Sequence, residues 1–137
     1  MSIRTAVLRV STAIATTAIA TAALAGAAAA APTEAVQAPY AQAAGSINAD
    51  GTIQNSKGVV SVNKPEAGRY CIQLETATPI SDLVANATPR SGAAWNTQIF
   101  VTAEPNSRCG NRTDTLLVTT GNPTNGATDA PFNFTVS

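Results

Sequence analysis

The stretch Arg69-Tyr70-Cys71-Ile72-Gln73-Leu74-Glu75 decides the fold class, because its side chains alternate in character. Tyr70, Ile72 and Leu74 would share one face of an extended chain, and Cys71 would lie on the opposite face with the polar residues. Alternation with a period of two predicts a half-buried β-strand rather than a helix. The preceding Pro65-Glu66-Ala67-Gly68 is typical of a tight turn.

Short runs of the same kind continue on both sides of this strand, separated by turn residues. Asp50-Gly51 predicts a hairpin between two arms, and Gly58-Val59-Val60-Ser61-Val62 is β-branched. We expect a polar loop at 105–111 and a long surface loop at 121–131. Besides the strand at 69–75, the runs predicted as strands therefore lie at 46–48, 52–54, 58–62, 82–88, 95–102, 113–120 and 131–136.

Seven or eight short strands at about ten-residue spacing predict an all-β protein. The region after residue 45 has no apolar stripe of helical period and length, which disfavours βαβ units. Strands punctuated by Gly and Pro turns favour a sandwich or a small barrel. We therefore predict a single antiparallel β-sandwich, Ig-like or jelly-roll-like, over residues 45–137.

The N-terminal thirty residues have the layout of a secretory signal peptide. Arg4 and Arg9 form a positive start, 10–24 is apolar except for five hydroxyl residues, and a run of small residues follows. A transmembrane anchor is the alternative, but the hydroxyls and the poly-Ala end dilute the hydrophobic segment. We predict a signal peptide over 1–30, so that the only membrane contact is through this cleaved segment.

Cleavage after Ala30 is favoured over cleavage after Ala31, because Pro32 would then follow the cut directly. A later cut after Ala43 is an alternative. Residues 31–44 contain Pro and Ala without periodicity and predict a flexible lead-in. Without Arg4 and Arg9, six Lys and Arg face eight Asp and Glu, so the exported part is slightly acidic.

Composition excludes several function classes. The chain has no His, which removes Ser-His-Asp and Cys-His nucleophiles and His-ligated zinc sites. Its formal net charge of zero gives no field to attract nucleic acid. No phosphate-binding glycine loop or metal motif occurs. We therefore expect a protein that is not an enzyme, has no cofactor and binds no nucleic acid.

The two cysteines, Cys71 and Cys109, predict a disulfide in an exported chain. Closing a loop of this size would stabilise the fold by about 4 kcal/mol in the chain-entropy description. Two free buried thiols are one alternative. A redox-active pair is the other, although it would call for closer spacing.

Trp95 and Phe100 are the candidate ligand contacts. They fall in one predicted strand on opposite faces, so one of them should be less buried, and that one is the better candidate for a contact. An aromatic platform for a sugar is the functional interpretation and core packing is the alternative. A hydrolase using a carboxylate pair from Glu75, Glu104 and Asp114 is a weaker hypothesis.

Five motifs, in order, resemble a group of small secreted actinobacterial β-domain proteins of unknown function. They are Asn48-Ala49-Asp50-Gly51-Thr52, Lys57-Gly58-Val59-Val60-Ser61-Val62, Gly68-Arg69-Tyr70-Cys71-Ile72, Ser107-Arg108-Cys109-Gly110 and Phe132-Asn133-Phe134-Thr135-Val136. The resemblance implies an exported β-domain and brings no catalytic residues with it.

These observations predict a secreted, non-enzymatic β-sandwich protein that binds an extracellular protein or polysaccharide or has a structural role outside the cell. The alternative is a small secreted protease inhibitor, which would present a rigid exposed loop at 88–93 or 104–110.

Overall fold

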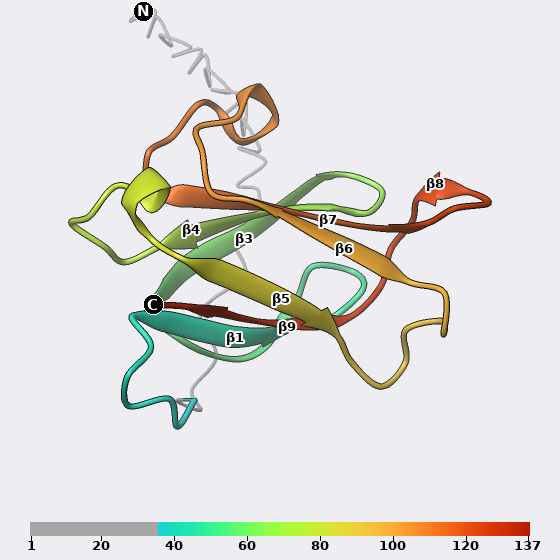
Figure 1. The fold of residues 1–137 in the computed structure, drawn as a ribbon, viewed down its shortest axis with the longest axis horizontal. Coiled ribbons are helices and arrows are strands. Elements are labelled where there is room, and N and C mark those ends of the chain that lie inside the picture. Colours follow the sequence, from blue (N-terminus) through green and yellow to red (C-terminus); the bar gives the residue numbers. More distant parts are fainter. Residues whose placement is uncertain (1–35) are drawn as a thin grey trace, which may run out of the picture.

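The computed structural model describes residues 36–137, so the expected signal peptide and residues 31–35 of the lead-in lie outside the described residues. The described chain folds into two packed antiparallel sheets (Figure 1). Two short 3-10 helices, η1 (Ile80–Asp82) and η2 (Ser107–Cys109), lie in its connections. The strands are β1 (Ala43–Ile47), β2 (Ile53–Lys57), β3 (Val59–Glu66), β4 (Arg69–Leu74), β5 (Ala85–Pro89), β6 (Gln98–Thr102), β7 (Thr115–Asn122), β8 (Gly126–Ala127) and β9 (Phe132–Val136).

The predicted β-sandwich is confirmed. The first sheet has the strand order β2-β1-β9-β5, and the second has β3-β4-β7-β6 with β8 added to β7. The first and last strands, β1 and β9, pair with each other in the middle of the first sheet. The first and last strands of the domain therefore lie side by side at the centre of one sheet. The other sheet is built entirely from strands that lie between them in the sequence (Figure 1).

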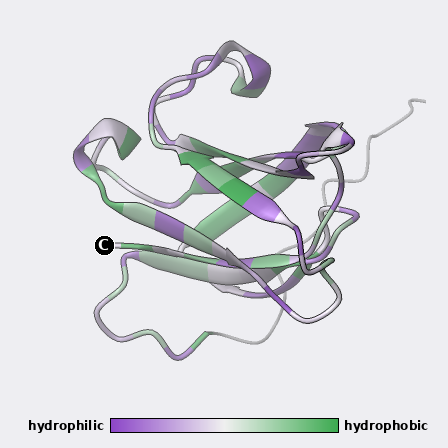
Figure 2. Ribbon diagram, turned by 45° about the vertical axis from the view of Figure 1, so that its right-hand side comes forward, coloured by the Kyte–Doolittle hydropathy of each residue, from purple (hydrophilic) through white to green (hydrophobic). Residues whose placement is uncertain are grey.

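The alternating strand places its apolar side chains in the core as predicted. Tyr70, Ile72 and Leu74 on β4 are buried between the sheets. The Tyr70 ring meets Phe132 of β9 edge to face, with ring centroids 5.1 Å apart, a favoured geometry for aromatic pairs. Figure 2 shows that the most hydrophobic segments lie on the strands. Burial of these side chains is the main force that joins the two layers.

The Tyr70 hydroxyl ties two turns to the core. It donates a hydrogen bond to the carbonyl of Ala49 (2.8 Å) and accepts one from the Ala130 amide (3.3 Å). Burial raises the pKa of Tyr70 above its ordinary value, so the hydroxyl stays protonated and keeps its donor role. The β1–β2 turn and the segment that enters β9 are thereby fixed to the same side chain.

The domain begins earlier than the sequence pattern predicted. β1 starts at Ala43, two residues before the expected boundary, and both Ala43 and Ala44 are buried. The preceding residues also contact the first sheet, because the Lys57 ammonium donates to the carbonyls of Ala38 (2.8 Å) and Ala41 (2.7 Å). The boundary was missed because small Ala side chains give no hydrophobic period, although they fit closely against neighbouring backbone.

The expected long loop at 121–131 contains part of the second sheet. β7 runs on to Asn122, and β8 pairs with its end. The predicted strand 82–88 is also divided, because Asp82 belongs to η1 and the strand β5 begins only at Ala85. Turn-forming residues obscured β8 and this division in the sequence. Within residues 36–137, no helix is long and apolar enough to cross a membrane.

Candidate functional site

Trp95 lies on the connection between β5 and β6 and is fully exposed (106%). The prediction that it shares a strand with Phe100 is wrong, because β6 begins only at Gln98. The residues before β6 form a turn instead, in which the Thr97 amide donates to the Ala94 carbonyl (3.0 Å). Residues 89–95 and Thr97 line an open hollow of about 430 Å³.

Arg90 anchors the base of this connection. Its guanidinium donates to the side-chain oxygens of Gln54 and Asn48, and its backbone amide donates to the Pro131 carbonyl (3.2 Å). The Nε atom of Arg90 is buried without a hydrogen-bond partner among residues 36–137. The segment that carries Trp95 is thus fixed at one end to three other parts of the first sheet and its turns.

Phe100 is also exposed (63%) but belongs to a different surface. Thr119 of β7 pairs with Phe100 on one side and with Arg69 of β4 on the other, so the three lie in a row on the outer face of the second sheet. They border a hollow of about 240 Å³ together with Gln98 and Asn122. The two candidate contacts are therefore both exposed and lie in separate hollows.

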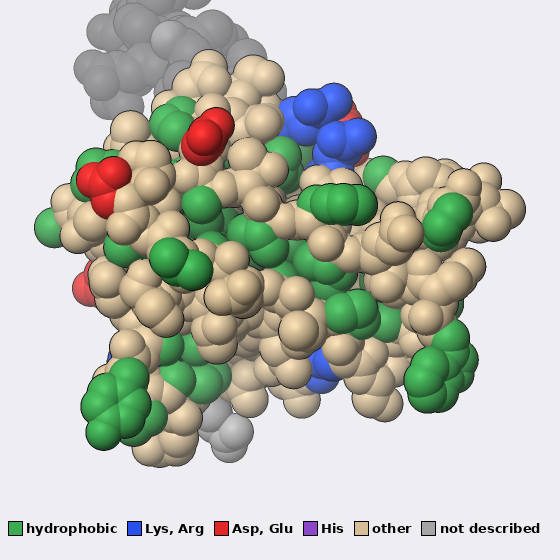
Figure 3. All heavy atoms as spheres, viewed as in Figure 1, with side chains coloured by type: hydrophobic (Ala, Val, Ile, Leu, Met, Phe, Trp, Pro, Cys, Tyr) green, Lys and Arg blue, Asp and Glu red, His purple; other side chains and the backbone are tan. Residues whose placement is uncertain are grey.

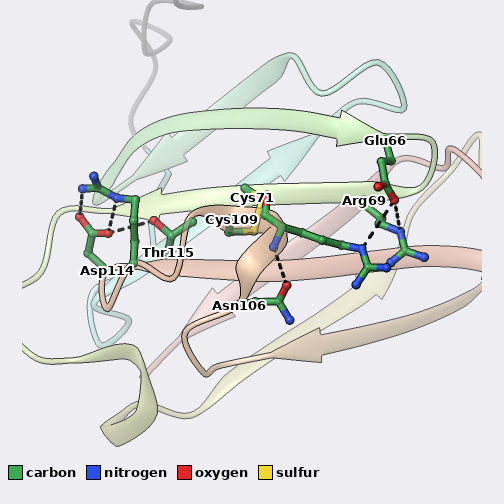
Figure 4. Close-up of a disulfide and its surroundings, with 9 residues drawn as sticks. Glu66, Arg69, Cys71, Asn106, Cys109, Asp114 and Thr115 are labelled. Carbon is green, nitrogen blue, oxygen red and sulfur yellow. Dashed lines mark hydrogen bonds and ion pairs between the residues drawn. A yellow bond between two sulfur atoms is a disulfide. The ribbon is translucent and has the colours of Figure 1, made fainter.

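The predicted disulfide between Cys71 and Cys109 is confirmed, with their Cα atoms 5.5 Å apart. Cys71 pairs with Leu117 across β4 and β7, and Cys71, Cys109 and Leu117 form a small buried cluster apart from the main core. The disulfide therefore fastens η2 onto the outer face of the second sheet (Figure 4).

Ion pairs flank the disulfide on this outer face (Figure 4). On one side Glu66 forms ion pairs with Arg69 (2.8 Å) and Arg108 (3.6 Å). On the other side Arg112 forms an ion pair with Asp114 (2.6 Å). Hydrogen bonds from Arg112 hold the pKa of Asp114 at about 2, helped by smaller contributions from Thr115 and Gln73.

A third hollow, of about 290 Å³, lies over β3, β4 and β7 beside the disulfide. Nothing in the hydrophobic pattern pointed to it, because its lining comes from four separate segments. The only sequence signal was the presence of two arginines close to Cys109. Its lining residues are Ser61, Asn63, Cys71, Gln73, Arg108, Cys109, Gly110, Arg112 and Thr115.

The candidate carboxylates do not form a visible acid–base pair. Glu75 and Glu104 are exposed and border none of the three hollows described above, while Asp114 is occupied by Arg112. A carboxyl with a pKa of about 2 is a poor proton donor near neutral pH. In the described part of the chain, no three His, Cys, Asp or Glu side chains group closely enough to hold a metal.

Together, the two sheets and the single cross-link define a small disulfide-bonded β-sandwich domain with solvent-exposed aromatic and arginine-lined hollows. No protein-family model, curated protein or solved structure matches the chain. The resemblance to small secreted actinobacterial proteins therefore stays a prediction.

Proposed function

We propose that this chain is an exported, non-catalytic binding domain that contacts a polysaccharide outside the cell through Trp95. The observation that carries the proposal is the complete exposure of Trp95 at the rim of an open hollow. An indole ring with no core contact adds nothing to the hydrophobic stabilisation of the fold. A flat aromatic face in water is, however, well suited to pack against the apolar face of a sugar ring.

The anchoring of the loop supports this role. Arg90 connects the start of the Trp95 segment to the side chains of Gln54 and Asn48. A contact residue on a fixed segment loses less conformational entropy on binding than one on a free loop. The Trp95 hollow can therefore be largely formed before a ligand arrives.

Two features support export. The Cys71–Cys109 disulfide belongs in an oxidising compartment. The N-terminal sequence has the three-part layout of a signal peptide. Both fit a ligand that is met outside the cytoplasm.

The single Trp of the chain provides a direct test. Purified protein is titrated with soluble polysaccharides and incubated with insoluble cell wall, while tryptophan emission and retention are measured. We expect a ligand that covers the indole to shift the emission to shorter wavelength, and Trp95→Ala to lose about tenfold in affinity, the equivalent of about 1.4 kcal/mol.

Tyr40→Ala is the matched control, because Tyr40 is as exposed as Trp95 (98%) but lies before β1. It should bind like the parent chain. Equal retention of parent and Trp95→Ala on every matrix, or no retention at all, would refute the proposal.

The inhibitor hypothesis predicts a different result, namely inhibition in a panel of serine proteases and metalloproteases. Both candidate loops are largely exposed and held in place by contacts, as this hypothesis requires. Arg90 in the 88–93 loop is held by Gln54 and Asn48, and the 104–110 loop contains η2 and the disulfide. No specific contact therefore favours inhibition over binding, and the panel decides between them.

A further inference from the structure

We propose that the outer face of the second sheet holds a separate binding site for a carboxylate-bearing glycan, with Arg108 and Arg112 as its cationic contacts. The site lies in the hollow of about 290 Å³ beside the disulfide. It shares no lining residue with the Trp95 hollow, so this proposal can be tested independently of the polysaccharide contact proposed above.

The floor of this hollow is polar and formed by adjacent strands. Ser61 of β3 pairs with Gln73 of β4, which pairs with Thr115 of β7, and Asn63 pairs with Cys71 in the next row. Hydroxyl and amide groups thus lie side by side across three strands. Ser61 already donates to the Gln73 side-chain oxygen (3.3 Å), and Gln73 and Thr115 donate to Asp114 (3.1 and 2.9 Å). The exposed Asn63 amide is therefore the floor group best placed to bond sugar hydroxyls.

The charges around the hollow favour an anion. Glu66 is shared by two arginines and lies closer to Arg69 (2.8 Å) than to Arg108 (3.6 Å). Within residues 36–137 this long contact is the only ion pair of Arg108. Two guanidinium groups therefore face a single carboxylate, and Arg108 keeps donors free for an incoming acid.

Arg112 adds a second cationic edge. It binds Asp114 through Nε and Nη2, and Nη1 has no hydrogen bond to any residue in the described range 36–137. In Figure 4 the disulfide lies between Asp114 on one side and Glu66 with Arg69 on the other. On the face drawn in Figure 3, Lys, Arg, Asp and Glu side chains are few, and uncharged side chains and backbone prevail.

The backbone of Arg108 is fixed in advance. Its amide donates to the Asn106 side chain (3.0 Å), and its neighbour Cys109 is bonded to Cys71. With the backbone fixed, binding has to order only the side chain of Arg108, which lowers the entropic cost of a contact to a carboxylate. Breaking the disulfide should release η2 and weaken binding at this site.

The lining selects a glycan over a peptide. Apart from the buried disulfide, the lining side chains are polar or charged, and Gly110 has none. Such a surface offers no apolar pocket for a peptide side chain, whereas a uronate ring supplies a carboxylate for Arg108 and hydroxyls for the floor.

The test uses the full-length chain in its oxidised form, with polygalacturonate as the probe and dextran and poly-L-glutamate as comparison polymers. We expect binding to polygalacturonate that exceeds binding to both and that weakens at high salt. Arg108→Gln should reduce the affinity about tenfold, the size expected for one charge-assisted hydrogen bond. Glu66→Gln should raise it about threefold, because it removes the competing carboxylate.

Asp82→Asn is the matched control for Glu66→Gln, because it removes the same charge from η1, outside the lining of the hollow. It should leave the affinity unchanged, and thermal unfolding verifies that each variant is folded. The proposal is refuted if polygalacturonate does not bind, if Arg108→Gln binds as tightly as the parent, or if Asp82→Asn raises the affinity as much as Glu66→Gln does. Equal binding of poly-L-glutamate would refute the glycan assignment.

Discussion

Asp114 shows how single side chains stabilise the outer face of the second sheet. Its two oxygens accept hydrogen bonds from Arg112, Gln73 and Thr115. All of these donors favour the charged form of the carboxyl, and they hold its pKa at about 2, against an ordinary value of 3.8. Protonation of Asp114 would weaken its two hydrogen bonds from Arg112 and those from Gln73 and Thr115.

This pKa shift predicts that the free energy of unfolding falls at low pH. Because the pKa is lower in the folded chain than in the unfolded chain, Asp114 stabilises the fold above about pH 4, and its contribution falls away as the pH approaches about 2. The free energy of unfolding, measured in urea across this range, should fall more steeply for the parent than for Asp114→Asn.

Asp50 and Asp129 also have a lowered pKa, through hydrogen bonds from Thr52 and from Gly68 and Lys64 respectively, so the variant should keep some acid sensitivity. Identical slopes for parent and Asp114→Asn would contradict the prediction.

At the scale of elements, the β3–β4 turn is shaped by a close approach at Gly68. This residue has a positive φ of 65°, and a Cβ there would lie 2.4 Å from the Thr120 carbonyl oxygen and 2.6 Å from the Thr128 amide nitrogen. Gly126, the first residue of β8, has nearly the same φ of 70°, but no described atom lies within 4 Å of its Cβ position. The two glycines thus share a left-handed conformation and differ in the space around them.

Gly68→Ala and Gly126→Ala form a matched pair that separates the two effects. Gly126→Ala should cost about 1–2 kcal/mol, the usual penalty of a left-handed conformation. Gly68→Ala should cost clearly more, because backbone atoms of β7 and of the segment after β8 must also move. The measurement is chemical denaturation of both variants, and equal losses would show that the contact is relieved without cost.

For the whole molecule, the disulfide and the core are separate sources of stability. The main core lies between the sheets, whereas Cys71 and Cys109 sit in a small cluster on the outer face of the second sheet. Both cysteines belong to that sheet and its β6–β7 connection, so the bond does not join the two layers.

Replacing both cysteines by Ala should therefore loosen one connection and leave the sandwich assembled. We expect the free energy of unfolding to fall by about 4 kcal/mol, the chain-entropy value for a loop of this length. Amide exchange should increase most in residues 103–114, with the strand signal in circular dichroism retained. Uniformly faster exchange through β1 and β9 would instead show that the disulfide supports the core.

The sequence predicted the fold class because hydrophobic alternation is a local property. The β4 pattern identified the buried Tyr70, Ile72 and Leu74 and placed Cys71 on the opposite face. The disulfide could be predicted from the even number of cysteines alone, without any particular spacing between Cys71 and Cys109. Boundaries were less well predicted, as at Ala43 and Trp95, where small or turn-forming residues carry no period.

By itself, the sequence determined the β-sandwich class, the strand faces and the disulfide, because each follows from alternation, turn residues or cysteine number. Only the tertiary structure decided that Trp95 and Phe100 belong to different hollows and that Arg108 lies beside a polar floor of β3, β4 and β7. These placements depend on strand order and register between residues far apart in the chain, and no local pattern in the sequence encodes them.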